Sequence, residues 1–153
     1  MPFPLIAIVA SSVLTIGYFL SKEKTKKVFI SFYSKEDSHY KNLICAWVKN
    51  KKFDFLIEDF STNIGIKSSN QHYLKRRMKG QIEKSDYFIV FIGDKTHSRH
   101  WVLWEIEQAK LLNKKIIAVK ESKKHKSPKP LLNCKTTWVY NFTVQGLKEA
   151  LKV

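Results

Sequence analysis

The chain has 153 residues, which fits one domain of ordinary size, and its 44% hydrophobic content can supply a packed core. The formal net charge is +15, but the lysines are scattered along the chain rather than gathered with aromatic residues in one segment. This distribution argues against a nucleic-acid-binding protein, which gathers basic and aromatic side chains on one surface, and leaves that function as a minor alternative.

The first 21 residues carry no charged side chain. Phe3 to Leu20 form an 18-residue, mostly apolar run, which as a helix would span about 27 Å, close to the ~30 Å hydrocarbon core of a bilayer. Four lysines follow within residues 22–27, and the positive-inside rule places such a flank in the cytoplasm. We therefore predict a single-pass anchor in the cell inner membrane with a cytoplasmic carboxyl-terminal domain.

The predicted domain boundaries are a transmembrane anchor at 1–21, a basic juxtamembrane segment at 22–26 and a folded domain at 27–153. A cleaved signal peptide is one alternative, but it normally begins with a positively charged region, which this chain lacks. A buried core helix is the other alternative.

After the anchor, short apolar runs alternate with segments whose apolar residues lie three or four apart. In chain order we expect a strand at 27–32, a helix at 34–50, a strand at 53–57, a long loop at 58–70, a helix at 71–85, a strand at 86–92, a helix at 99–113, a strand at 115–120, a basic loop at 121–130, a strand at 136–140 and a helix at 143–151. This alternation predicts an α/β fold with a doubly wound, five-stranded parallel sheet. The first, third and fourth strands are apolar throughout, as expected of strands covered on both faces.

Residues 97–107 are the most informative segment. Trp101 and Glu105 are four residues apart at the start of the third expected helix, so they share one helix face. That face lies close to the carboxyl end of the preceding strand, the edge where open α/β sheets bind ligands. Because Phe32, Tyr33 and Ser34 follow the first strand, we expect them to line the same crevice.

Several common sites are missing from the sequence. Neither phosphate-binding glycine motif and no G-x-S-x-G motif occurs, and the cysteines and histidines lack metal-ligand spacing. A phosphorelay receiver is also excluded, because the first strand runs into Ser31-Phe32-Tyr33-Ser34 instead of acidic residues and the fifth ends without a lysine. No metal site is expected.

The order and spacing of these segments resemble the TIR-domain family, and within it the TIR-like proteins of bacterial Thoeris anti-phage systems. The resemblance covers about residues 26–119, and its most specific part is S-x-x-W-V-x-W-E-I at 98–106. Its other parts are Val28 to Phe32, Asp59 with Ser61, Tyr73 to Arg77, Ile82, Ser85, Ile89 to Gly93, and Thr96.

The resemblance implies a flavodoxin-like sheet with the strand order 2-1-3-4-5. It also implies cleavage or cyclisation of NAD+, the substrate and not a cofactor, to an ADP-ribose-type signal that activates a separate effector protein. Self-association through TIR surfaces is expected as well. The alternative function is a non-catalytic TIR scaffold that assembles signalling proteins at the membrane.

By its place in the motif, Glu105 matches the family's catalytic glutamate. A carboxylate can stabilise the oxocarbenium-like ribose that forms when an N-glycosidic bond breaks. Trp101 offers a flat face for a base or nicotinamide, while Arg99 and the start of its helix suit a pyrophosphate.

Simpler interpretations stay open at each position. A glutamate in a helix is usually solvated, as we expect for Glu107. Trp104 is expected to pack, and Phe32 is more often a core residue than a ligand contact. The basic stretches at 22–27 and 123–129 are best explained by attraction to an anionic membrane surface.

Overall fold

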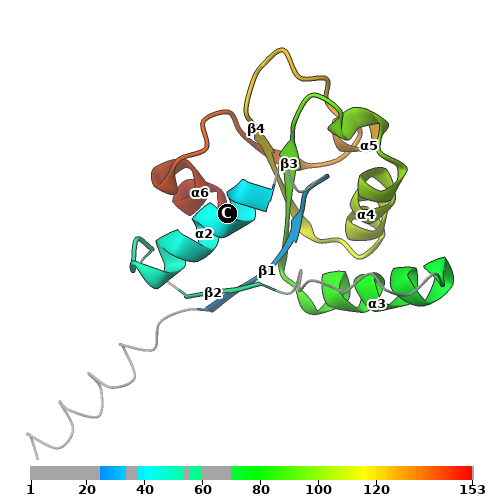
Figure 1. Cartoon of the computed structure of the whole chain (residues 1–153), viewed down its shortest axis with the longest axis horizontal. Helices are drawn as coiled ribbons and strands as arrows, with labels where there is room; N and C mark the ends of the chain where they lie inside the picture. Colours follow the sequence, from blue (N-terminus) through cyan, green and yellow to red (C-terminus); the bar gives the residue numbers. More distant parts are fainter. Residues whose placement is uncertain (1–24, 34–37, 54–55, 60–69, 153) are drawn as a thin grey trace, which may run out of the picture.

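The computed structural model describes residues 25–33, 38–53, 56–59 and 70–152. Within them the chain forms a five-stranded parallel sheet with the order β2-β1-β3-β4-β5 (Figure 1). This confirms the predicted number of strands and their order. The strands are β1 (Thr25–Ser31), β2 (Leu56–Asp59), β3 (Tyr87–Ile92), β4 (Lys115–Lys120) and β5 (Thr136–Val139).

Helices cover both faces of the sheet. In Figure 1, α2 and α6 lie on one face and α3, α4 and α5 on the other. The helical segments are α2 (Ser38–Lys49), α3 (Gln71–Lys84), a short 3-10 turn (Thr96–Ser98), α4 (His100–Leu111), α5 (Lys129–Leu132) and α6 (Val144–Ala150). The short α5 falls partly within the loop predicted at 121–130, because Pro130 suits the first turn of a helix.

The core consists of two apolar clusters separated by the sheet. All six residues of β3 are buried, and they alternate between the clusters because successive strand residues point to opposite faces. Tyr87, Ile89 and Phe91 join the cluster under α2 and α6, whereas Phe88, Val90 and Ile92 join the cluster under α3 and α4. As predicted from their apolar sequences, β1, β3 and β4 are the central strands.

The folded domain begins earlier than predicted. β1 starts at Thr25, and Lys26 is buried with its Nζ donating to Tyr87 Oη at 3.0 Å. Tyr87 Oη in turn donates to the carbonyl of Leu151 at 3.1 Å, so the start of β1 and the end of α6 are linked through this network. Lys26 therefore belongs to the fold and not to a juxtamembrane segment at 22–26. The sequence could not show this, because a buried lysine depends on partners distant in the chain.

β2 lies later than predicted, at Leu56–Asp59 instead of 53–57. Phe53 is buried in the cluster under α2 and α6, but it precedes the strand. The apolar character of Phe53 thus reflects core packing and not sheet pairing. The predicted anchor at 1–21 lies outside the described residues. Of the helices that the structure describes, none is long and apolar enough to cross a membrane.

Candidate active site

Glu105 lies on α4, beside the stripe that holds this helix against the sheet. Val102, Ile106 and Ala109 form the stripe, as predicted, and all three are buried. Because Glu105 lies three residues after Val102 and four before Ala109, its side chain borders this stripe and points inward, and it is only 4% exposed. Glu107, in contrast, is exposed as expected, with its Oε1 3.4 Å from Lys110 Nζ.

Two donors hold the buried carboxyl group. The hydroxyl of Ser31 donates a hydrogen bond to Glu105 Oε2, and the side chain of Trp101 forms a second hydrogen bond one helical turn away. Ser31 is the last residue of β1, so Glu105 sits at the carboxyl end of that strand. β1 and β3 are neighbours at the point where the strand order reverses, the usual ligand position in this type of sheet.

The surroundings of Glu105 raise its pKa from 4.5 to about 7. Burial is the main cause, because it removes water that would stabilise the negative charge, while the hydrogen bonds from Ser31 and Trp101 act in the opposite direction. The charge of the carboxyl group therefore changes with pH near neutrality. A titratable group with a strongly perturbed pKa at a ligand-binding edge is a typical functional-site candidate.

An aromatic pair adjoins the carboxyl group. The rings of Trp101 and Trp104 lie 5.7 Å apart between centroids and are tilted by 38°. Lys75 Nζ, from α3, lies 5.6 Å from the centroid of the Trp104 ring. Trp104 is half-buried between two helices, which agrees with the packing role expected of it.

Tyr33 and Arg99 form a second unit near the start of α4. The Arg99 guanidinium carbon stacks 3.8 Å from the centroid of the Tyr33 ring, which suits a cation–π interaction. Arg99 Nε is buried and has no hydrogen-bond partner among the described residues. No described side chain caps α4, whose first backbone N–H groups also lack partners within the helix. The start of α4 therefore offers hydrogen-bond donors together with the positive charge of Arg99.

One of the predicted contact residues, Phe32, is not brought to this site. Phe32 packs against the cluster under α2 and α6, on the sheet face opposite Glu105. Alternation along the strand puts Ser31 and Phe32 on opposite faces, which argues against the predicted contact between Phe32 and substrate. Ser34 lies outside the described residues.

Ser31 is the site residue that sequence reasoning missed. It is a buried hydroxyl in a strand whose residues from Val28 to Ile30 are buried and apolar. A lone serine at the carboxyl end of such a strand is the signal that could have identified it. Thr96, which the resemblance already included, accepts a hydrogen bond from Gly93 N through its Oγ1 at 2.9 Å, and this bond shapes the turn between β3 and α4.

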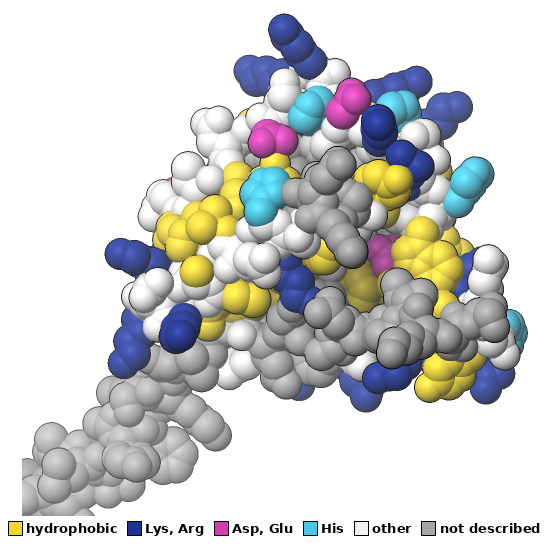
Figure 2. Space-filling model, viewed as in Figure 1, with side chains coloured by type: hydrophobic (Ala, Val, Ile, Leu, Met, Phe, Trp, Pro, Cys, Tyr) yellow, Lys and Arg dark blue, Asp and Glu magenta, His cyan; other side chains and the backbone are white. Residues whose placement is uncertain are grey.

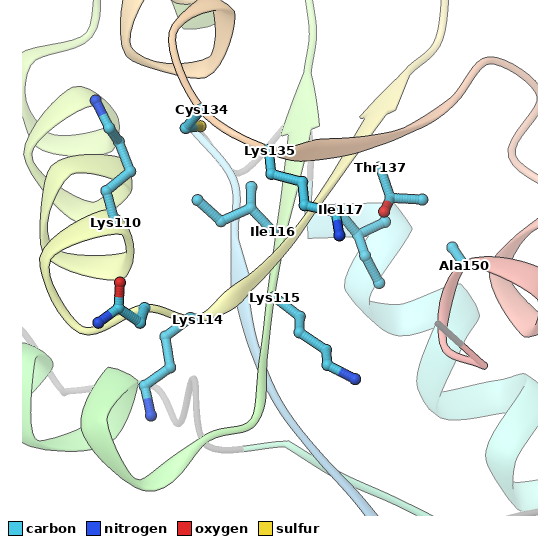
Figure 3. Close-up of a pocket in the computed structure, with 10 residues that line it drawn as sticks. Lys110, Lys114, Lys115, Ile116, Ile117, Cys134, Lys135, Thr137 and Ala150 are labelled. Atoms are coloured by element: carbon cyan, nitrogen blue, oxygen red, sulfur yellow. The ribbon is translucent and has the colours of Figure 1, made fainter.

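A hollow of about 430 Å³ lies elsewhere, at the amino ends of β4 and β5 (Figure 3). Lys110, Lys114, Lys115 and Lys135 contribute to its lining. It lies at the sheet edge opposite Glu105, because all five strands are parallel. It is therefore separate from the site of the buried carboxyl group.

Comparison with known proteins identifies the family. A sequence model described as Thoeris protein ThsB, TIR-like domain, matches residues 29–126. The chain belongs to this family. The match confirms the resemblance that was based on residues 26–119. No curated protein sequence matches the chain.

Solved structures share the fold of this TIR-like domain. The Clostridium botulinum CMP N-glycosidase BcmB has 15% sequence identity and a TM-score of 0.57, covering 83% of this chain and 98% of that one. A 2-deoxyribosyltransferase from the psychrotolerant bacterium Bacillus psychrosaccharolyticus has 11% identity and a TM-score of 0.55, with 80% and 90% covered. At these identities the likeness establishes the architecture.

Proposed function

We propose that this TIR-like domain cleaves NAD+ between nicotinamide and ribose, with Glu105 as the catalytic residue. The observation that carries the proposal is a buried carboxyl group, with its pKa raised to about 7, at the reversal point of the sheet. Family membership supports it, since the domain belongs to a Thoeris family. The two similar structures, named a CMP N-glycosidase and a deoxyribosyltransferase, support glycosyl chemistry on this fold.

The chemistry suits a single carboxylate. In NAD+ the ribose C1′ is bonded to a pyridinium nitrogen, so nicotinamide departs neutral with the bonding electrons and needs no proton. Positive charge develops on the ribose ring, and an ionised Glu105 beside it lowers the energy of this transition state. A buried carboxylate interacts with that cation more strongly than an exposed one, because the local dielectric is low.

The second step decides the product. Water attacking C1′ gives ADP-ribose and releases one proton, whereas attack by a nucleophilic group of the same molecule gives a cyclic product and also releases one proton. With a pKa of about 7, Glu105 is suited to accept that proton at neutral pH. A cyclic or modified ADP-ribose released in this way is the signal for a separate effector protein.

The surrounding residues suit the other parts of NAD+. Trp101, hydrogen-bonded to Glu105, places a ring beside the reacting ribose, where it can stack against nicotinamide. Arg99 and the uncapped start of α4 suit the pyrophosphate, because the buried Arg99 Nε still has a hydrogen bond to donate. Tyr33 holds the guanidinium in place by stacking. NAD+ acts as substrate in this scheme, and no other cofactor takes part.

Two further proposals concern where and how the domain acts. Residues 1–21 anchor the chain in the cell inner membrane as a single span, with the domain in the cytoplasm, since a charge-free segment of this length precedes a lysine cluster. Self-association through surfaces of the domain brings the protein into its active assembly.

The test is nicotinamide release from NAD+ by the full chain in detergent, at high protein concentration and with a crowding agent. Glu105→Gln keeps shape but removes the charge, and a transition-state charge interaction of about 3–4 kcal/mol corresponds to a loss of about 10²–10³-fold in turnover. Glu107→Gln is the matched control, because its side chain is exposed on the same helix. If the folded, assembled wild type releases no nicotinamide, the protein is a non-catalytic scaffold.

A further inference from the structure

A row of lysines marks the edge of the sheet at which the strands begin. β1 and β3 are paired so that Val28 lies beside Tyr87, which brings Lys27 next to Asp86. Lys115 begins β4 beside Tyr87, and Lys135 precedes Thr136, the partner of Ile116. Four neighbouring strands therefore carry three lysines and one aspartate at this edge.

Helix ends extend the same edge. In a doubly wound fold the helices run opposite to the strands, so their carboxyl ends lie where the strands begin. Together the exposed lysines there form what we call the amino-edge surface: Lys27, Lys52, Lys84, Lys115, Lys135 and Lys152. Glu83, Asp86 and Glu149 are the exposed acidic residues beside them among the described residues, so six lysines face three acidic residues and positive charge dominates.

The surface is hollowed as well as basic. The cavity of about 430 Å³ opens here, and Figure 3 shows Lys114 and Lys115 extending from the start of β4, with Lys135 on the neighbouring segment. Lys114 Nζ donates to the carbonyls of Glu83 and Ser85 at 2.6 and 2.7 Å, which fixes it against the end of α3. A concave, lysine-lined surface is complementary to anionic headgroups.

The chain enters the fold at this same edge. Thr25, the first described residue, begins β1, and residues 1–21 before it carry no charged side chain. We infer that the amino-edge surface docks on an anionic lipid bilayer, so that the edge carrying Glu105 faces away from the membrane. The inference rests on the proposed anchoring and not on NAD+ cleavage.

This geometry revises the expectation for the second basic stretch. Residues 123–129 follow β4 and therefore lie at the carboxyl edge, opposite Thr25. In Figure 2, Lys and Arg side chains lie at the upper and the lower margins of the molecule. Lys26 and Lys27, the described lysines of the first stretch, are thus at the opposite edge from residues 123–129, and only the first stretch adjoins the edge that docks.

The experiment is lysine footprinting of the full chain reconstituted into vesicles, with a membrane-impermeant amine reagent and mass spectrometry. Vesicles of phosphatidylcholine are compared with vesicles that also contain phosphatidylglycerol. We expect labelling of Lys115 and Lys135 to fall about fivefold or more in the anionic vesicles, the factor that one lysine near such a surface contributes. Lys123 and Lys124 should label equally in both, and 1 M salt should restore labelling, because it shortens the screening length to about 3 Å.

Two matched double variants distinguish docking through the amino-edge surface from a general effect of positive charge. Lys115→Gln with Lys135→Gln should abolish the protection of Lys27, whereas Lys123→Gln with Lys124→Gln should leave it unchanged. Equal labelling in both vesicles, protection of Lys123 instead, or protection by a DNA duplex rather than by lipid would each overturn the inference. Carbonate extraction of the same samples reports anchoring separately: a chain that resists extraction but shows no protection is anchored without docking.

Discussion

Replacing Glu105 by glutamine should make the protein more stable at alkaline pH. A carboxyl group with a raised pKa binds its proton more tightly in the folded than in the unfolded state. The folded state is therefore favoured at acidic pH, and this advantage is lost as the pH rises from the unfolded-state pKa of 4.5 to the folded-state value of about 7. Above this window the buried negative charge weighs against folding.

The magnitude follows from the two pKa values. A difference between 4.5 and about 7 corresponds to about 3 kcal/mol of unfolding free energy, because each pKa unit is worth about 1.4 kcal/mol. Glutamine cannot ionise, while its carbonyl oxygen can still accept from Ser31 and Trp101. At pH 8 the variant should therefore be more stable by up to about 3 kcal/mol, which for a domain of this size is on the order of 10 °C in Tm.

The assay is urea unfolding followed by tryptophan fluorescence, for wild type and Glu105→Gln at pH 5 and pH 8. The informative quantity is the difference in unfolding free energy between wild type and Glu105→Gln, because the contributions of all other titratable groups cancel in that difference. Glu107→Gln is the matched control, because it removes an exposed carboxyl group from the same helix. A stability difference that stays the same at both pH values, or a variant less stable than wild type at pH 8, would refute the reasoning.

The remaining predictions concern the site and the topology. In wild type, kcat/KM for NAD+ should rise with pH through about 7, as Glu105 ionises; a flat profile would exclude this role. Ser31→Ala removes a hydrogen bond that lowers the Glu105 pKa, so the rise should move to higher pH, and an unmoved profile would show that Ser31 does not control the charge. Trp101→Phe should also move the pH profile of kcat/KM to higher pH, with little change in KM, because the ring remains but the hydrogen bond is lost. Trp101→Ala should move the profile in the same way and also raise KM for NAD+; if the two variants have the same profile and the same KM, the stacking role is contradicted. A reporter fused after Val153 should be active only if it is a type that works in the cytoplasm, and periplasmic activity would invert the proposed topology.

The architecture could be predicted because its signals are local. Apolar runs such as Tyr87–Ile92 identify central strands, and helix periodicity places Val102, Ile106 and Ala109 on one face. Elements whose positions depend on distant parts of the chain either lie at other residues than predicted or were not predicted. β2 begins at Leu56 instead of Phe53, whose apolar side chain packs in the core, and the four-residue α5 is too short to show periodicity.

The candidate site was predicted in part. The spacing of Trp101 and Glu105 was enough to place both on one helix face, and the structure adds a hydrogen bond between them. The depth of Glu105 was not predictable, because it depends on how closely α4 packs against β1. Ser31 was missed for the same reason: its partner is 74 residues away in the sequence.

Burial links the stability of this domain to its proposed chemistry. A solvated glutamate would cost nothing to ionise, but water would screen its attraction to a ribosyl cation. Because Glu105 is buried, ionising it costs free energy, but the resulting carboxylate attracts a neighbouring positive charge more strongly. The pyridinium ring of NAD+ supplies such a charge on binding, so the bound substrate itself should lower the Glu105 pKa and favour the ionised form. By reciprocity, ionised Glu105 binds NAD+ more tightly than protonated Glu105 does. The hydrogen bonds from Ser31 and Trp101 then keep the pKa near 7, low enough for the substrate to complete the ionisation.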